Sequence, residues 1–203
     1  SISGQTIDYT FDTTLYDGYY FPEWYFGHIP KNWKHDVTTD LFNEMLNTSL
    51  GTTSSLSHRL KNLEEPILYG ENEDLVYRIT WEPSFNHPIV IRIVLNKKGA
   101  NIHWKVGKGK AGYIMGGILK EGKATISKRE FYKIANELDA LGLSAEENFY
   151  YLPMTDGIFA TIECNKYGMF KALGSNILCW GLEDLMYKLS KKYFKDIDTG
   201  IKD

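Results

Sequence analysis

Three stretches decide the fold of this chain: LVYRITW (residues 75–81), IVIRIVL (89–95) and NIHWKV (101–106). In each stretch large apolar residues alternate with other residues, as in strands whose side chains point in turn to two faces. The turn-forming residues Glu82-Pro83 and Asn96-Lys97-Lys98-Gly99 separate them. Because the connections are short, we expect three antiparallel strands joined as a meander.

The sequence predicts helices both before and after these strands. It also predicts further strands toward the C-terminal end. Apolar residues at helical spacing mark each helix, and Ser127 with Glu130 has the spacing of a capping box. The order of elements is typical of an α+β fold, with an antiparallel sheet of about five or six strands covered by helices. The expected helices span about residues 38–47, 55–64, 128–142 and 176–194, and the further strands about 148–152, 158–164 and 167–172.

The N-terminal region has a different texture. Residues 1–35 are crowded with aromatic rings and interrupted by Pro22 and Pro30. We interpret them as an extended aromatic arm that packs on a core; the alternative is a stacking platform for a sugar or a partner. We expect a single domain over residues 1–203, with the arm and a helical subregion at 1–66 and a sheet-and-helix core at 67–195.

The composition excludes several classes of protein. The chain has 203 residues, 23 Lys and Arg, 26 Asp and Glu and a net charge of −3, which argues against a nucleic-acid binder. No apolar stretch approaches the length of about 18 residues that spans a membrane. Cys164 and Cys179 have no metal-ligand spacing, and two buried free thiols are favoured over one disulfide. We expect no metal and no cofactor; a processed terminus at Ser1, and a lipid anchor upstream of it, are left open.

Four cationic side chains on the predicted strands form the candidate binding site. If the large apolar residues face the core, then Arg78, Arg92, His103 and Lys105 all point to the other face. Glu163, on a later strand, is a candidate partner for them. One interpretation is a docking face for an anion or an acidic protein. The favoured alternative is a structural Arg–Glu network on a solvated sheet face, because structural ion pairs also give such patterns.

Motifs for catalysis are weak. Residues 107–112 match G-x-G-x-x-G, but two further glycines follow where a dinucleotide site needs a helix, so a hairpin is expected. A hydrolase would have to use His87, His103 and Glu163, none of which lies in a known motif. Adjacent carboxylates such as Glu64-Glu65 are interpreted as solvated surface. We therefore lean against an enzyme without excluding one.

The core resembles an uncharacterised family of bacterial proteins, many of them exported or lipid-anchored. The resemblance covers about residues 72–193, rests on the order of its features, and departs from the family pattern at Ala160 and at Phe170-Lys171. It implies an envelope or extracytoplasmic setting, no established activity, and a fold-defining polar network. The features are Tyr77-Arg78-Ile79-Thr80-Trp81, F-x-x-P-x-x-x-R from Phe85 to Arg92, Gly116-Gly117, Asp156-Gly157 with Glu163, and a Leu-rich terminal helix; the network is Arg78, Arg92, Asp156 and Glu163.

Together these observations favour a non-enzymatic extracytoplasmic binding protein that engages a protein partner. An immunity-type inhibitor that masks a toxin is one concrete form. A small hydrolase with a His–carboxylate site is the alternative, and a glycan-binding module that uses the N-terminal rings is the third. We expect a periplasmic, cell-surface or secreted location, with the cytoplasm left open.

Overall fold

The chain divides into two compact units, Ser1–Lys61 and Asn62–Asp203. Most of the first unit, with the expected helix at 38–47 and almost all of the aromatic arm, lies outside the residues that the structure describes. The structure, a computed structural model, describes residues 20–21, 51, 53–70, 73–111, 116–143, 157–166, 171–175 and 179–195.

In the first unit the described residues form a short helical segment. Residues 53–61 are helical, close to the expected start at 55, and Leu56 and Leu60 are buried. The backbone N–H of Tyr20 donates to the Ser57 hydroxyl at 2.9 Å, and Phe21 beside it is fully buried. The side chains of these two aromatic residues are therefore buried rather than exposed to solvent.

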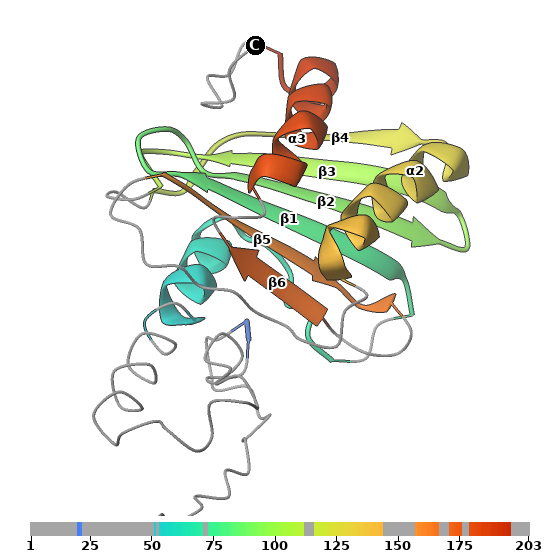
Figure 1. Cartoon of the computed structure of the whole chain (residues 1–203), viewed down its shortest axis with the longest axis horizontal. Helices are drawn as coiled ribbons and strands as arrows, with labels where there is room; N and C mark the ends of the chain where they lie inside the picture. The colour runs from blue at the N-terminus through green and yellow to red at the C-terminus, as the bar shows by residue number, and fades with distance from the viewer. Residues whose placement is uncertain are drawn as a thin grey trace, which may run out of the picture. The chain divides into compact units, whose positions relative to one another are not determined.

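The second unit is built on a six-stranded sheet in which every neighbouring pair is antiparallel (Figure 1). The first three strands form the expected meander, β4 adds a fourth strand beside β3, and β5 then returns to pair with the free side of β1. This confirms an α+β fold with an antiparallel sheet covered by helices. The strands are β1 (Leu75–Pro83), β2 (Ile89–Asn96), β3 (Gly99–Gly107), β4 (Ile118–Ile126), β5 (Ile158–Cys164) and β6 (Lys171–Ser175), in the order β4-β3-β2-β1-β5-β6.

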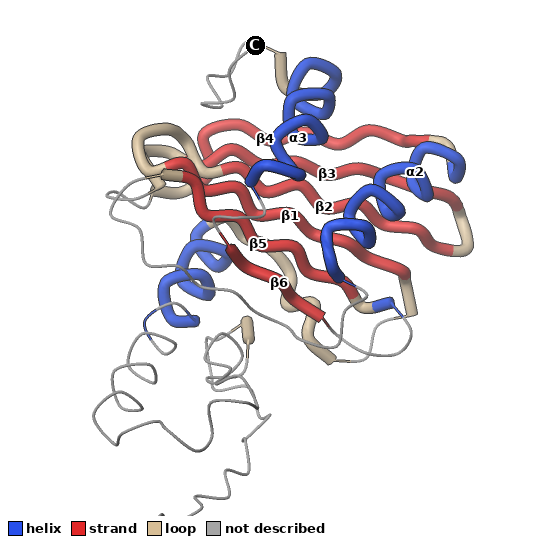
Figure 2. The backbone as a smooth tube through the Cα atoms, viewed as in Figure 1, coloured by secondary structure: helices blue, strands red, loops and turns tan. Residues whose placement is uncertain are grey.

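Two helices lie across one face of this sheet, α2 (Lys128–Leu138) and α3 (Cys179–Tyr193) (Figure 2). Ser127 caps α2 by accepting a hydrogen bond from the Glu130 N–H at 3.1 Å. The helical pattern continues past α2 as a π-helical turn, η2 (Asp139–Leu143), which contains a non-helical glycine. Among the described residues, no helix has both the length and the apolar character needed to cross a membrane.

The core lies between the sheet and these helices. Trp81, Phe131, Leu138 and Leu182 are fully buried there. The Tyr77 ring meets the Phe131 ring edge-on with centroids 6.1 Å apart. Each large side chain buried in this way stabilises the fold by about 1.5–3 kcal/mol before losses in conformational entropy.

Strand β4 is the element that the sequence pattern did not reveal. Its sequence, ILKEGKATI, contains two lysines and a glycine, and most of its residues are exposed. A strand at the edge of a sheet needs no apolar alternation, because it has little to bury. Strand β6 lies later than the expected 167–172, and the expected strand at 148–152 lies outside the described residues.

Candidate functional site

The register of the sheet gathers the predicted cations into one row on the face opposite the helices. Arg78 pairs with Glu163 on one side and with Arg92 on the other. Arg92 pairs with His103, and His103 with Lys123 on β4. One row of five ionisable side chains therefore crosses five strands, and Lys105 lies two residues beyond it on β3.

Arg78 and Glu163 form a buried ion pair. The Arg78 Nε and Nη2 atoms each donate to a Glu163 carboxylate oxygen at 2.5 Å, and neither side chain is exposed. The remaining guanidinium nitrogen, Nη1, donates to the Pro66 carbonyl at 2.6 Å. Burial raises the pKa of Glu163, and the charge and hydrogen bonds of Arg78 oppose that rise. Arg78 is thus engaged inside the protein.

Glu65 is the second carboxylate of the network. Its oxygens lie 2.9 Å from Arg92 Nε, 3.3 Å from Lys105 Nζ and 3.7 Å from Arg78 Nη1, and its side chain is 1% exposed. The expectation that Glu65 is solvated surface was wrong. No local pattern marks it; the only available signal was the excess of cations on one sheet face, which requires carboxylates from elsewhere.

The reason for this burial is a segment, residues 63–68, that crosses the sheet face. The carbonyl oxygens of its first two residues each accept a hydrogen bond from Lys105 Nζ at 2.7 Å. At its other end Leu68 forms a buried apolar cluster with Val76 and Val94. This segment therefore covers the cationic face at the inner strands. The expectation of an Arg–Glu network on a solvated sheet face is corrected, because the network is buried.

His103 is the half-buried member of the row. Its pKa is lowered, first by burial and then by the positive charges of Arg92 and Lys123, which outweigh the attraction of Glu65. The ring is consequently neutral near pH 7. Asp156, the fourth residue of the expected polar network, lies outside the described residues.

The structure does not bring together His87, His103 and Glu163. The Nδ1–H of His87 donates a hydrogen bond to the Gly109 carbonyl at 2.8 Å. It precedes Arg92, the register partner of His103, by five residues, or about 16 Å along a strand. Strands β2 and β1 also separate His103 from Glu163, a backbone distance of about 14 Å.

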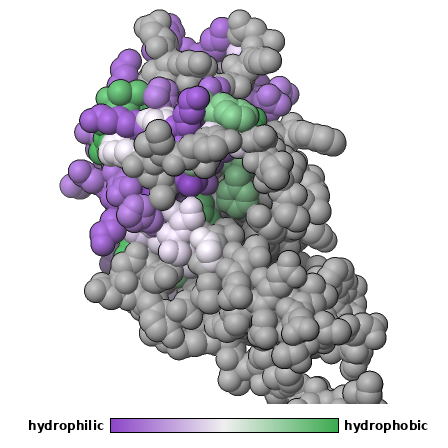
Figure 3. Space-filling view, turned by 90° about the vertical axis from the view of Figure 1, so that its left-hand side faces the viewer, coloured by the Kyte–Doolittle hydropathy of each residue, from purple (hydrophilic) through white to green (hydrophobic). Residues whose placement is uncertain are grey.

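The glycine-rich stretch after β3 forms a hairpin connection. The Lys108 N–H donates to the Gly117 carbonyl at 2.9 Å, and the Gly116 N–H returns to the Lys108 carbonyl at 3.2 Å. A Cβ atom on Gly116 would lie 2.6 Å from Lys108 Cβ, so close packing requires glycine there. Strand β4 begins at Ile118, where a phosphate-binding loop would open a helix. Figure 3 looks at this end of the sheet, where hydrophilic side chains gather.

A second polar cluster, which the sequence did not indicate, joins β1, η2 and β5. The Tyr77 hydroxyl donates to Asp139 at 3.0 Å, and Lys166 Nζ donates to the same carboxylate. Cys164 is a buried free thiol that accepts the Lys166 backbone N–H at 3.1 Å. Burial raises the pKa of both Cys164 and Tyr77, so both stay protonated and poorly nucleophilic. This cluster therefore links elements and lacks an activated nucleophile.

Neither a search for metal-binding geometry nor comparison with protein families and curated proteins assigns a function to this site. Within the described ranges no group of three or more His, Cys, Asp or Glu side chains has the geometry to hold a metal ion. Comparison with protein-family models and with curated proteins found no match. The site is thus defined by its geometry: an α+β sheet domain whose predicted binding cations largely bind its own carboxylates and carbonyls.

Proposed function

We propose that this protein is a non-enzymatic binding protein that engages a protein partner through the edge strand β4. The observation that carries the proposal is the character of that edge. β4 has nine residues, most of them exposed, and within the described residues the sheet order gives it no neighbour on its outer side. An exposed edge offers main-chain donors and acceptors to an added strand, a recurring mode of peptide recognition.

The polar row is the weaker candidate for such contacts. The Arg78 side chain is fully buried, and those of Arg92 and Lys105 are only 17% and 12% exposed. A ligand that used these cations would have to displace Glu65, Glu163 or the crossing segment. The docking surface proposed from the sequence is accordingly moved from the cationic face to β4.

The setting of the interaction is part of the proposal. We place it outside the cytoplasm, at the cell surface, in the periplasm or in the medium, with an immunity-type inhibitor as one concrete form. What supports this is the resemblance of residues 72–193 to an uncharacterised family of bacterial proteins, many of which are exported or lipid-anchored. The separation of His103 from Glu163 makes a hydrolase site the less supported alternative.

Site-specific photocrosslinking tests the proposal. A photoreactive amino acid replaces Leu119 on β4 in one variant and Ile67 in the control; each native side chain is 48% exposed. The tagged proteins are incubated with envelope and secreted fractions of the source organism, irradiated and analysed by mass spectrometry. We expect one stoichiometric protein adduct at position 119 and none at 67. Equal adducts at both positions, or none under several growth conditions, would overturn the proposal and turn the search to hydrolase and glycan screens.

A further inference from the structure

The positive charge of this chain is concentrated around β4. Between Lys97 and Lys133 the sequence has ten Lys or Arg residues and only two acidic ones, Glu121 and Glu130, although the whole chain has a net charge of −3. Lys120 and Lys123 of β4 are both exposed. The ten cations are Lys97, Lys98, Lys105, Lys108, Lys110, Lys120, Lys123, Lys128, Arg129 and Lys133.

Tertiary contacts bring the basic end of α3 to the same edge. The Phe194 ring lies 5.6 Å from the Trp104 ring of β3, and Trp104 pairs with Gly122 of β4. In Figure 1 the C-terminal end of α3 extends past β4. Lys192, in the last turn of α3, contacts Glu130 in the first turn of α2. The ends of two helices therefore adjoin the edge strand.

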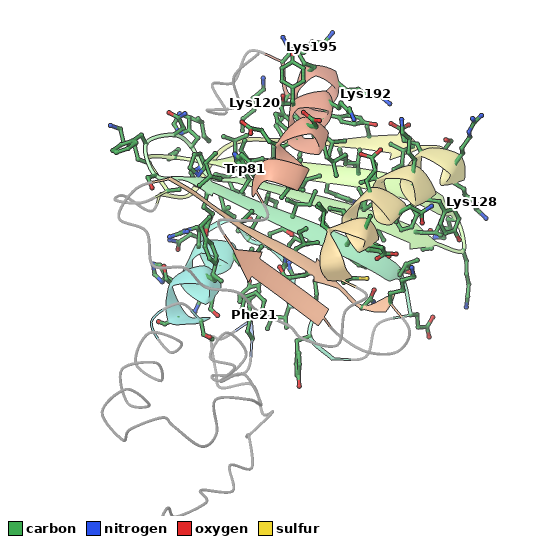
Figure 4. The ribbon with its side chains drawn as sticks, in the orientation of Figure 1. Phe21, Trp81, Lys120, Lys128, Lys192 and Lys195 are labelled. Carbon is green, nitrogen blue, oxygen red and sulfur yellow. The ribbon has the colours of Figure 1, made fainter. Side chains whose placement is uncertain are left out.

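We call the resulting region the β4 basic surface and define it by six exposed cations. Two come from β4, two from the first turn of α2, one from the last turn of α3 and one from just after α3. Figure 4 labels four of them, Lys120, Lys128, Lys192 and Lys195, along this side of the molecule. The six are Lys120, Lys123, Lys128, Arg129, Lys192 and Lys195.

The two faces of β4 differ in the charges that they carry. Lys120, Gly122 and Ala124 alternate on the helix side, in register with the core residues of β3. Two of these three residues are small, and a Cβ on Gly122 would overlap the Trp104 ring. The Trp104 ring therefore fills the helix side next to Gly122, and Lys120 is the one charged residue that β4 places on that side. Glu121 and Lys123 lie on the opposite side, where the charges of both signs nearly cancel.

We infer that the partner presents an extended acidic segment to β4, with its carboxylates on the helix side of the sheet. This inference rests on the proposed function and names the chemistry of the partner. Main-chain hydrogen bonds along β4 supply the part of the affinity that does not depend on the sequence of the partner. Carboxylates opposite Lys120 and Lys195 supply the selection for acidic sequences, since opposite charges across an interface steer association and set specificity.

The test uses two fluorescent ten-residue peptides and a matched pair of variants. One peptide alternates Glu with Val, and the other alternates Lys with Val. Lys120→Glu and Lys123→Glu reverse the same charge on exposed residues of the same strand, but on opposite faces. Fluorescence anisotropy of the full chain with each peptide, in low and high salt, measures binding, and circular dichroism verifies that both variants are folded.

We expect the acidic peptide to bind and the basic peptide not to bind. Lys120→Glu should weaken acidic-peptide binding about fivefold or more, as attraction becomes repulsion, and Lys123→Glu less than twofold. Salt should weaken binding to the wild type. Equal effects of the two variants would overturn the placement on the helix side. Tighter, Lys120-dependent binding of a single-stranded DNA oligonucleotide would overturn the acidic-protein assignment in favour of a nucleic acid. A Leu119 adduct whose yield Lys120→Glu leaves unchanged would overturn this inference while the proposed function stands.

Discussion

Arg78 and Glu163, 85 residues apart in the sequence, face each other on β1 and β5 and share two 2.5 Å hydrogen bonds in a fully buried position. A buried ion pair gains little over an apolar pair, because desolvating two charges offsets their attraction. Its value here is in specifying register. A slip of β5 by one residue would move Glu163 to the helix face, among apolar side chains.

The coupling between Arg78 and Glu163 can be measured by a double-mutant cycle. Arg78→Met leaves a carboxylate buried without its guanidinium partner, and we expect the free energy of unfolding to fall by about 3–5 kcal/mol. Adding Glu163→Met removes the orphaned charge, so the double variant should be more stable than Arg78→Met alone. Urea unfolding of the wild type and the three variants gives the cycle. Strict additivity would show that the two residues do not act as a pair.

Glu65 should be as important to stability as Arg78, although it lies outside any strand. Glu65→Gln leaves Arg92 and Lys105 without a counter-charge, and we expect a loss of about 2–4 kcal/mol in the free energy of unfolding. The control is Glu64→Gln, an exposed neighbour for which the loss should stay below about 0.5 kcal/mol. Similar losses at both positions in urea unfolding would contradict the network.

The lowered pKa of His103 predicts a loss of stability in mild acid. Burial, Arg92, Lys123 and Lys105 disfavour the imidazolium, and Glu65 favours it. The unfolded chain therefore takes up this proton near the ordinary pKa of 6.5, above the pKa in the folded state. The stability that neutral His103 contributes is present above pH 6.5 and is lost as the pH falls below that value toward the folded pKa.

His103→Gln isolates this effect from the other histidines. Gln stays neutral at every pH, so between pH 7.5 and 5.5 the wild type should lose more stability than the variant. Urea unfolding at intervals of half a pH unit measures both curves. Parallel curves would mean that His103 has the same pKa in the folded and unfolded states.

Gly122 should resist substitution because the Trp104 ring covers its α-carbon. A Cβ atom on Gly122 would overlap the ring, whereas one on Gly117 would meet nothing within 4 Å. We expect Gly122→Ala to lower the free energy of unfolding by about 1–3 kcal/mol and to shift tryptophan fluorescence, with Gly117→Ala near neutral. Thermal unfolding followed by fluorescence compares the two, and an unchanged melting temperature for Gly122→Ala would contradict the packing.

The Cys164 thiol should be inert in the folded protein. It is buried, 3% exposed, and its pKa is raised, so little reactive thiolate forms at pH 8. In a Cys179→Ser variant, which leaves Cys164 as the only thiol, we expect Ellman's reagent to react at least about 100-fold faster after unfolding in guanidinium chloride. Equal rates in the native and unfolded protein would place Cys164 at the surface.

Local patterns were enough for the parts of the fold that repeat along the chain. The alternation around Tyr77, Ile91 and Trp104 predicts β1, β2 and β3, because a strand with one face in the core must alternate. Ser127 predicts the start of α2 because its side chain caps the nearby N–H of Glu130. Alternation also predicts that Arg78, Arg92 and His103 share one face of the sheet. In the structure these three residues are direct cross-strand neighbours.

What the cations contact was decided by tertiary structure. Glu65 reaches Arg92 across 27 residues, and Glu163 reaches Arg78 across 85. No local period specifies such pairs, since each depends on how distant segments fold against the same sheet. The edge position of β4 follows from the order of all six strands, and the approach of the α3 end to it follows from the contact between Phe194 and Trp104. The sequence by itself therefore determined the three strands β1, β2 and β3, the start of α2, and the faces of the side chains on these strands. The tertiary structure decided which charges are buried in pairs and which stay exposed at the β4 edge, because burial and pairing depend on contacts between segments far apart in the chain.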